Sequence, residues 1–380
     1  MKKVLTINTK YRLSGGEDTN IVDELIFLQK EFEVEYLEFN NNKITLFDLI
    51  SFVTSSNLQS NKSLKEKVDL FKPDFAYIHN TWFKANLGII KLLHKRGIPI
   101  YLKIHNFRYD CTKTFSAKKH LEGKKSCYKC GFSKKNSKYF NKYYLESYLK
   151  SFFIIIYGKR YLKILRKYTT KILVLNEFHK SFLIQNNVES SKILVSYNPI
   201  QIKKTTPNSY KPSSNYIIYA GRLSESKGVE DLINSFINSK IRNINLKILG
   251  TGEEEKKLIS KYESDNIEFL GLLDNEKTLE YIINSRCVVT ATKMYEGQPR
   301  LLTEASNFGV PSIYPNFGGM SEFFPTNYPL SFEQYNYEDL TSKFGLLNDE
   351  NLLKELSKNV EDYITKILDF EKLKKSKVFK

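Results

Sequence analysis

Short apolar runs rich in β-branched and aromatic residues alternate along this chain with longer segments whose apolar positions recur at helical spacing. The alternation occurs twice, on either side of a polar stretch at 198–214 that contains three of the ten prolines. Such alternation is typical of parallel sheets covered by helices, so the sequence predicts an α/β fold. In the first half the predicted strands lie at 4–8, 33–38, 74–79, 98–104, 171–175 and 193–195.

The second half begins a new series of strands, predicted at 216–220, 246–249, 267–270, 287–290 and 312–314. The proline-rich stretch marks a domain boundary. We expect an N-terminal domain over 1–198, a C-terminal domain over 199–365 and a basic tail over 366–380 that could return to the first domain. Two α/β units of similar size favour a cleft between them, where folds of this class bind ligands.

The composition excludes several classes of protein. The chain has 380 residues, of which 41% are hydrophobic and 14% aromatic, so it can bury the cores of two domains and is not disordered. No apolar run approaches the roughly 20 residues that cross a bilayer, and the apolar stretch at the start is too short for a signal peptide. We therefore expect a cytoplasmic protein.

The net charge of +17 is concentrated in one segment. Residues 101–171 contain 19 Lys and Arg against three acidic residues, together with 16 aromatic residues. This pattern fits a solvated helical surface, a nucleic-acid site or a face that lies on an anionic membrane. No RNA-binding or zinc-finger motif accompanies it, so nucleic acid is not expected. We favour peripheral contact with the inner face of the cell membrane, where cations and aromatic rings suit the headgroup boundary.

A loop between a predicted strand and helix carries two cations, Arg222 and Lys227, after the glycine Gly221. The glycine lets the backbone turn sharply. Cations beside a helix N-terminus form an anion site, whereas in a plain solvated loop the same charges would point to water.

Two glutamates follow a later strand. Glu296 lies in a loop, and Glu304 lies in the next helix, whose first turn is expected to contain Pro299. Carboxylates at this spacing can accept hydrogen bonds from pairs of sugar hydroxyls, although on a solvated helix they would bind nothing.

The segments AGRLSESKG at 220–228, EGQPRLLTEA at 296–305 and PNFGGMSEF at 315–323 resemble, in order and spacing, the motifs of the group 1 (family 4) retaining glycosyltransferases. In the first half, SGGE at 14–17 and IHNFR at 104–108 resemble the glycine loop and the post-strand histidine of that family. The resemblance covers nearly the whole chain. It implies the GT-B fold, in which two Rossmann-like α/β/α domains face a central cleft.

The resemblance also implies roles for single residues. Glu304 would bind the nucleotide ribose, and Arg222 and Lys227 the donor diphosphate. His105 would approach the transferring sugar, which Glu296 and the residues after it would hold. The other donor-binding residues that it implies are Gly15, Gly16, Gly221, Gly297, Gln298, Pro299, Leu301 and Leu302. At two of these positions, Gln298 and Pro299, the chain departs from the commonest form of the motif, which bears on the choice of sugar.

The function implied is transfer of a hexose, with retention, from a UDP- or GDP-sugar to a saccharide or lipid-linked acceptor. A bacterial capsule or lipopolysaccharide pathway is the expected setting. The chain contains no Asp-x-Asp motif for a divalent metal, so we expect metal-independent catalysis in which the two cations stabilise the leaving diphosphate. The family mechanism needs no fixed protein base, because the departing phosphate can take the proton of the acceptor.

Two other functions stay open. A sugar-nucleotide epimerase can share this fold, but it would need further catalytic carboxylates that the sequence does not reveal. A nucleic-acid-binding or membrane-binding protein with a vestigial site would use the basic segment alone. The intact set of cations and glutamates argues against that second alternative.

Three cysteines lie within 20 residues, Cys111, Cys127 and Cys130, and could hold a structural zinc with His120 as the nearest fourth ligand. Plain reduced cysteines are the alternative. Packing roles are expected for His94, His120, His179 and Cys287, while His79, at the end of a predicted strand, could line the cleft.

Overall fold

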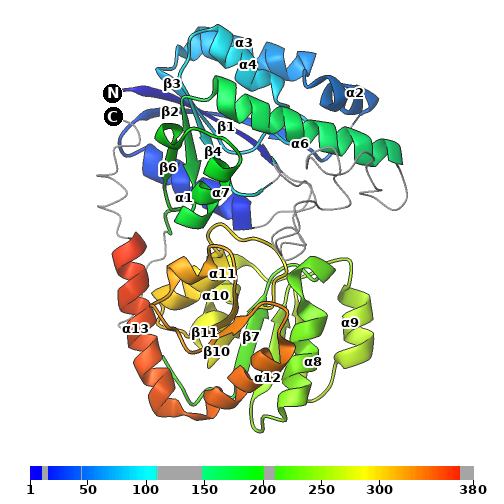
Figure 1. The fold of residues 1–380 in the computed structure, drawn as a ribbon, viewed down its shortest axis with the longest axis vertical. Coiled ribbons are helices and arrows are strands. Elements are labelled where there is room, and N and C mark those ends of the chain that lie inside the picture. The colour runs from blue at the N-terminus through cyan, green and yellow to red at the C-terminus, as the bar shows by residue number, and fades with distance from the viewer. Residues whose placement is uncertain (11–15, 44, 108, 110–147, 201–209, 369–380) are drawn as a thin grey trace. The chain divides into compact units, whose positions relative to one another are not determined.

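The computed structural model describes residues 1–10, 16–43, 45–107, 109, 148–200 and 210–368 (Figure 1). These residues form two compact units, one within Met1–Ile200 and one within Gln201–Lys372. Each unit is a parallel sheet flanked by helices, so the predicted fold class is confirmed. Residues 369–380 of the basic tail and most of the basic segment at 101–171 lie outside the described residues.

The sheet of the first unit has six strands in the order β2-β1-β3-β4-β5-β6, and every neighbouring pair is parallel. The strands are β1 (Lys3–Lys10), β2 (Glu33–Asn40), β3 (Phe75–Ile78), β4 (Ile100–Lys103), β5 (Lys171–Val174) and β6 (Ile193–Val195). The helices are α1 (Gly16–Leu28), α2 (Leu46–Thr54), α3 (Leu58–Phe71), α4 (Gly88–Lys95), α6 (Tyr148–Tyr168) and α7 (Glu177–Gln185).

Local chemistry fixes where several of these helices begin. Thr45 and Asp48 form a reciprocal capping box at the start of α2. The side chains of Asn57 and Asn176 accept a backbone N–H at the starts of α3 and α7. Because α7 starts directly after β5, it brings His179 to the carboxyl edge of the sheet, where parallel α/β folds bind their ligands.

The sheet of the second unit has the order β12-β11-β10-β7-β8-β9. Its strands are β7 (Tyr216–Ala220), β8 (Asn245–Leu249), β9 (Ile267–Gly271), β10 (Cys287–Val289), β11 (Ser312–Asn316) and β12 (Ser331–Glu333). The α-helices are α8 (Val229–Ser239), α9 (Glu255–Tyr262), α10 (Asn275–Ile283), α11 (Arg300–Asn307), α12 (Tyr337–Gly345) and α13 (Glu350–Leu368). The short edge strand β12 was not predicted, because three residues with one buried apolar side chain, Phe332, carry no period.

The last described helix, α13, packs against α11 at the edge of the second unit (Figure 1). Its apolar stripe, Leu353, Leu356, Val360 and Ile364, recurs every three or four residues and is buried. The hydroxyl of Tyr363 donates to the carbonyl oxygen of Glu322 at 3.3 Å. The helix that carries Glu304 therefore rests on the C-terminal part of the chain.

Candidate active site

The loop after the central strand β7 is built around a left-handed glycine. A 3₁₀ turn, Glu225–Lys227, ends at Gly228. Gly228 has a φ of +65° and is the residue directly before helix α8. A Cβ placed on Gly228 would lie 2.1 Å from the carbonyl oxygen of Ala291, in the loop after β10. Glycine is therefore needed both for the backbone angle and for the close approach of the two loops.

Lys227 and Glu296 form an ion pair between these two loops. The Lys227 ammonium donates to Oε1 of Glu296 at 2.5 Å, and the hydroxyl of Thr292 donates to the same oxygen at 3.3 Å. A backbone bond from Lys293 N–H to the Ser226 carbonyl, 2.9 Å long, adds a second connection. The two side chains are 29% and 23% exposed, so a ligand can reach both partners.

Arg222 lies in the same loop, two residues after the end of β7, and it is exposed. It makes no ion pair with any residue that the structure describes. The loop beneath it is held by Tyr219, whose hydroxyl donates to the Arg222 carbonyl at 3.0 Å. Burial raises the pKa of Tyr219 far above 10, so this phenol stays a neutral donor. Arg222 thus presents an unpaired cation on an anchored backbone, close in the sequence to the N-terminus of α8.

Glu304 is almost fully buried and paired within its own helix. Arg300 Nε donates to Oε1 of Glu304 at 2.6 Å, and Glu304 is 5% exposed.

The expectation that Pro299 occupies the first helical turn is wrong by one position. Pro299 has an extended ψ of 97° and precedes the helix, which begins at Arg300. Most of the predicted donor-binding residues between the two glutamates are buried, namely Gly297, Gln298, Pro299 and Leu302. Leu301 is partly exposed.

Of the predicted residues, the structure brings Lys227 and Glu296 into contact and sets Gly221 and Arg222 on the same loop. Gly16 is the first residue of α1. Gly15 and the cysteine cluster, Cys111, Cys127, Cys130 and His120, lie outside the described residues. Within the described part of the chain no group of three potential ligands could hold a metal ion.

Two polar partners were missed by the sequence analysis. Thr292 bonds to Glu296 across a loop turn, and nothing in the sequence singles it out. Arg300 lies four residues before Glu304 on a helix, a spacing that pairs opposite charges and that could have identified it.

In the first unit a buried polar cluster lies at the carboxyl ends of β3 and β4. Oε1 of Glu24, on α1, accepts from Lys103 Nζ at 2.7 Å and from the Tyr77 hydroxyl at 2.5 Å. Nδ1 of His79 lies 3.7 Å from the other Glu24 oxygen and 3.2 Å from Nε2 of His105. Burial lowers the pKa of Lys103, whereas the carboxylate of Glu24 opposes that shift.

Burial, with the charge of Lys103, lowers the pKa of His79 to about 3. Burial followed by the charges of His79 and Lys103 lowers the pKa of His105 well below its usual value of 6.5. Both imidazoles are therefore neutral at physiological pH. His105 keeps part of its surface exposed, whereas His79 is fully buried.

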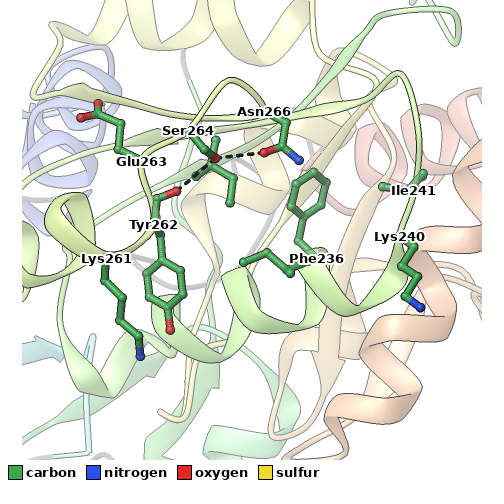
Figure 2. A pocket seen from close by; sticks show the side chains of 10 residues that line it. Phe236, Lys240, Ile241, Lys261, Tyr262, Glu263, Ser264 and Asn266 are labelled. Carbon is green, nitrogen blue, oxygen red and sulfur yellow. Dashed lines mark hydrogen bonds between the residues drawn. The ribbon is translucent and has the colours of Figure 1, made fainter.

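A cavity of about 360 Å³ lies at the opposite edge of the second sheet (Figure 2). Residues at the C-terminal ends of α8 and α9 and at the start of β9 line this cavity, among them Phe236, Lys240, Lys261 and Tyr262. No predicted site residue lines it. Because it lies at the amino ends of the strands, away from the usual ligand edge, it is not the candidate site.

Residues 202–363 match the family model of the glycosyl transferases group 1. An uncharacterised glycosyltransferase of Methanocaldococcus jannaschii is 23% identical over 90% of this chain and 84% of its own length. An uncharacterised 41.2 kDa protein in the cps region of Klebsiella pneumoniae is 23% identical over 50% of this chain. The amylovoran biosynthesis glycosyltransferase AmsD of Erwinia amylovora is 24% identical over 38%. The chain spans 54% and 42% of these last two relatives.

Solved structures share the fold at low sequence identity. HepE of Anabaena, solved in complex with UDP and glucose, has a TM-score of 0.70 at 13% identity, covering 98% of this chain and 97% of its own. Sucrose-phosphate synthase of Thermosynechococcus elongatus has a TM-score of 0.72 at 12% identity, covering 98% and 96%. The lipopolysaccharide outer core galactosyltransferase WaaB has a TM-score of 0.62 at 17% identity, covering 98% of both chains.

The two parallel sheets with their flanking helices thus give this chain the GT-B fold of glycosyltransferases of known structure. Within that fold, residues 202–363, which make up most of the second unit, are similar to the group 1 glycosyltransferases.

Replacing Gly228 by alanine is expected to destabilise the second unit. The added Cβ meets the Ala291 carbonyl and must displace the loop that carries Lys227. Gly271→Ala is the matched control, because Gly271 has nearly the same φ of +64° with nothing within 4 Å of the added Cβ. The control should cost about 1–2 kcal/mol of unfolding free energy, the price of the left-handed angle. Gly228→Ala should cost clearly more in denaturant titrations, and equal losses would contradict the steric account.

Proposed function

We propose that this protein transfers a hexose, with retention, from a UDP-linked donor to a saccharide or lipid-linked acceptor in bacterial surface polysaccharide synthesis. The observation that carries the proposal is the cationic loop after β7, with Lys227 bonded to Glu296 and Arg222 exposed beside it. Cations and a helix N-terminus at one position suit a diphosphate. HepE, which shares the fold, binds UDP and glucose, which favours uridine in the donor.

In the proposed reaction the bond between C1 of the sugar and the diphosphate oxygen breaks. Negative charge grows on the leaving phosphate, where Arg222 and Lys227 stabilise it without a metal ion. The acceptor hydroxyl attacks from the face that the phosphate leaves, and the phosphate takes its proton. Glu304 accepts hydrogen bonds from the ribose, and His105 contacts the transferred sugar.

Lys227 has a partner to exchange in this scheme. Its ammonium is bonded to Glu296, and a bound diphosphate would compete for it. Glu296 would then be released to accept hydrogen bonds from sugar hydroxyls, the role that the family resemblance implies. Donor binding and the placing of Glu296 against the sugar are thereby coupled in this proposal.

The test is a thermal-shift panel with UDP, GDP and ADP, followed by assays of nucleotide-sugar hydrolysis and transfer in EDTA. A nucleotide at 100 times its Kd stabilises the native state by about 2.7 kcal/mol. UDP should raise Tm, Glu304→Gln should reduce that rise, and Lys261→Ala, in the distant cavity, should not. Proton NMR of the product should show the anomeric configuration of the donor. Stabilisation by an oligonucleotide alone, or an inverted product, would overturn the proposal.

We also propose that the first unit contacts anionic membranes. Helix α6 exposes Lys159, Lys163 and Lys167, and it packs against α2. On α2, Phe47 and Ile50 are 83% and 52% exposed, so apolar groups that can enter the headgroup region lie on a helix next to these cations. No helix in the described part of the chain is long and apolar enough to span a bilayer.

Sedimentation with vesicles tests this contact. The protein should pellet with vesicles of phosphatidylglycerol and not with phosphatidylcholine, and high salt should release it. Replacing Phe47 and Ile50 by serine should weaken binding. Serine at Leu70, which is 84% exposed near the C-terminal end of α3, should not weaken it. Equal binding to both lipids, or equal effects of the two replacements, would count against a specific surface.

A further inference from the structure

The hydrogen bond between His79 and His105 requires one proton between two neutral rings. Nδ1 of His79 and Nε2 of His105 are 3.2 Å apart. A neutral imidazole carries one N–H and one acceptor nitrogen, so one ring donates and the other accepts. Which ring donates determines what His105 can offer to a ligand through its remaining nitrogen.

The carboxylate of Glu24 decides between the two arrangements. Lys103 and Tyr77 both donate to Oε1 of Glu24, and the other carboxylate oxygen, Oε2, faces Nδ1 of His79 at 3.7 Å. A lone pair on Nδ1 would face that negative charge, whereas an N–H is attracted to it. The electrostatics therefore favour a proton on Nδ1 of His79.

Burial points the same way. If His79 were the acceptor, its own proton would sit on Nε2, a buried atom without a hydrogen-bond partner among the described residues. A buried N–H without an acceptor is costly and rarer than an unused acceptor. With the proton on Nδ1, only a lone pair is left unused at Nε2.

We propose that His79 is a positioning residue, held by Glu24, that fixes His105 in the tautomer with its proton on Nδ1. His105 accepts at Nε2 and presents Nδ1–H as a donor, the reverse of the Nε2–H form that an isolated neutral histidine favours. That His105 offers this N–H to an oxygen of the sugar rests on the proposed function. The tautomer itself does not depend on it.

The first experiment is nitrogen-15 NMR of the full chain labelled at its five histidines, because nitrogen shifts distinguish protonated from bare ring nitrogens. His105 should show a protonated Nδ1. His79→Leu should move the proton to Nε2, and Glu24→Gln, which keeps the shape of the side chain, should give a mixture. His79→Asn, whose amide can donate from the position of Nδ1, should restore the native form. A protonated Nε2 in the unaltered protein, or no change in His79→Leu, would overturn the proposal.

His94→Gln serves as the control, because His94 is exposed on α4 away from the cluster. It should leave the signals of His105 unchanged, and a change there would overturn the local assignment. In transfer assays His79→Leu should lower kcat roughly tenfold or more, because His105 would no longer present its Nδ1–H as a donor. The KM for the sugar donor should stay within about threefold of that of the unaltered protein. His79→Asn should recover part of kcat. If the unaltered chain transfers no sugar, the proposed function fails while NMR still decides the tautomer.

Discussion

Replacing Arg222 by alanine is expected to lower kcat for sugar transfer by roughly 10²–10³-fold, as does removal of one preorganised donor elsewhere. The Arg222 side chain is exposed and has no ion-pair partner in the described structure, so its charge is available to the leaving diphosphate. Glu304→Gln should instead raise the donor KM, because a ribose contact is present before and during transfer and does not change the barrier from the bound state.

Lys227, which is bonded to Glu296, is tested together with Arg222 in a double-mutant cycle. Lys227→Ala should lower kcat as Arg222→Ala does, and the double replacement of both cations should be less than additive since they share one phosphate group. Steady-state kinetics with a saturable donor, after circular dichroism confirms folding, decide the roles. If Arg222→Ala changed only KM while Glu304→Gln abolished kcat, both assignments would be wrong.

Acidification is expected to destabilise the first unit steeply. His79 and His179 are fully buried and each has a pKa lowered to about 3, chiefly by burial. Between about pH 3 and pH 6.5 the unfolded chain binds a proton at each of these histidines, whereas the folded chain does not. Stability is therefore complete above pH 6.5 and falls as the pH drops, by about 1.4 kcal/mol per pH unit for each histidine. From pH 7.5 to 5.5 the two together should cost roughly 3 kcal/mol.

The single tryptophan, Trp82, lies in the first unit, so its fluorescence in urea titrations follows that unit alone. His179 is the better residue to replace, because it stacks on Phe107 at 4.2 Å between ring centroids and neither ring nitrogen has a polar partner in the described structure. His179→Phe should reduce the pH slope by about one proton, and His94→Gln should not. An unchanged slope in His179→Phe would refute the neutral buried state.

The sequence predicted the strands well because each is a short apolar run between turn residues. β6 and β7 have the predicted bounds, and the other predicted strands differ only at their ends. The positions of the motif residues could also be predicted, since a glycine, two cations and Glu296 lie in the loops after β7 and β10, at the edge that parallel sheets use for ligands, and Glu304 lies in α11. Within the described residues, Lys227 and Glu296 meet across loops that are 69 positions apart.

The buried cluster of the first unit was beyond sequence reasoning for a physical reason. Lys103 ends an apolar strand, and a lysine there is ordinarily taken to reach solvent. Its burial depends on Glu24, which is 79 positions away on α1 and pairs with it only in the folded chain. A periodic pattern records which face of an element is apolar, but it does not record which distant charge compensates a buried one.

The packing of α13 on α11 has a consequence for the timing of biosynthesis. A ribosome releases the chain from its N-terminus, and domains generally fold as units while synthesis continues. The strands and helices described for the first unit have all emerged by residue 200, but α11, which carries Glu304, lacks its covering helix until Leu356, Val360 and Ile364 have followed. A nascent chain that ends before α13 would thus hold the sheet of the first unit and an α11 without its covering helix, so the helix that carries Glu304 gains its packing partner last among these elements.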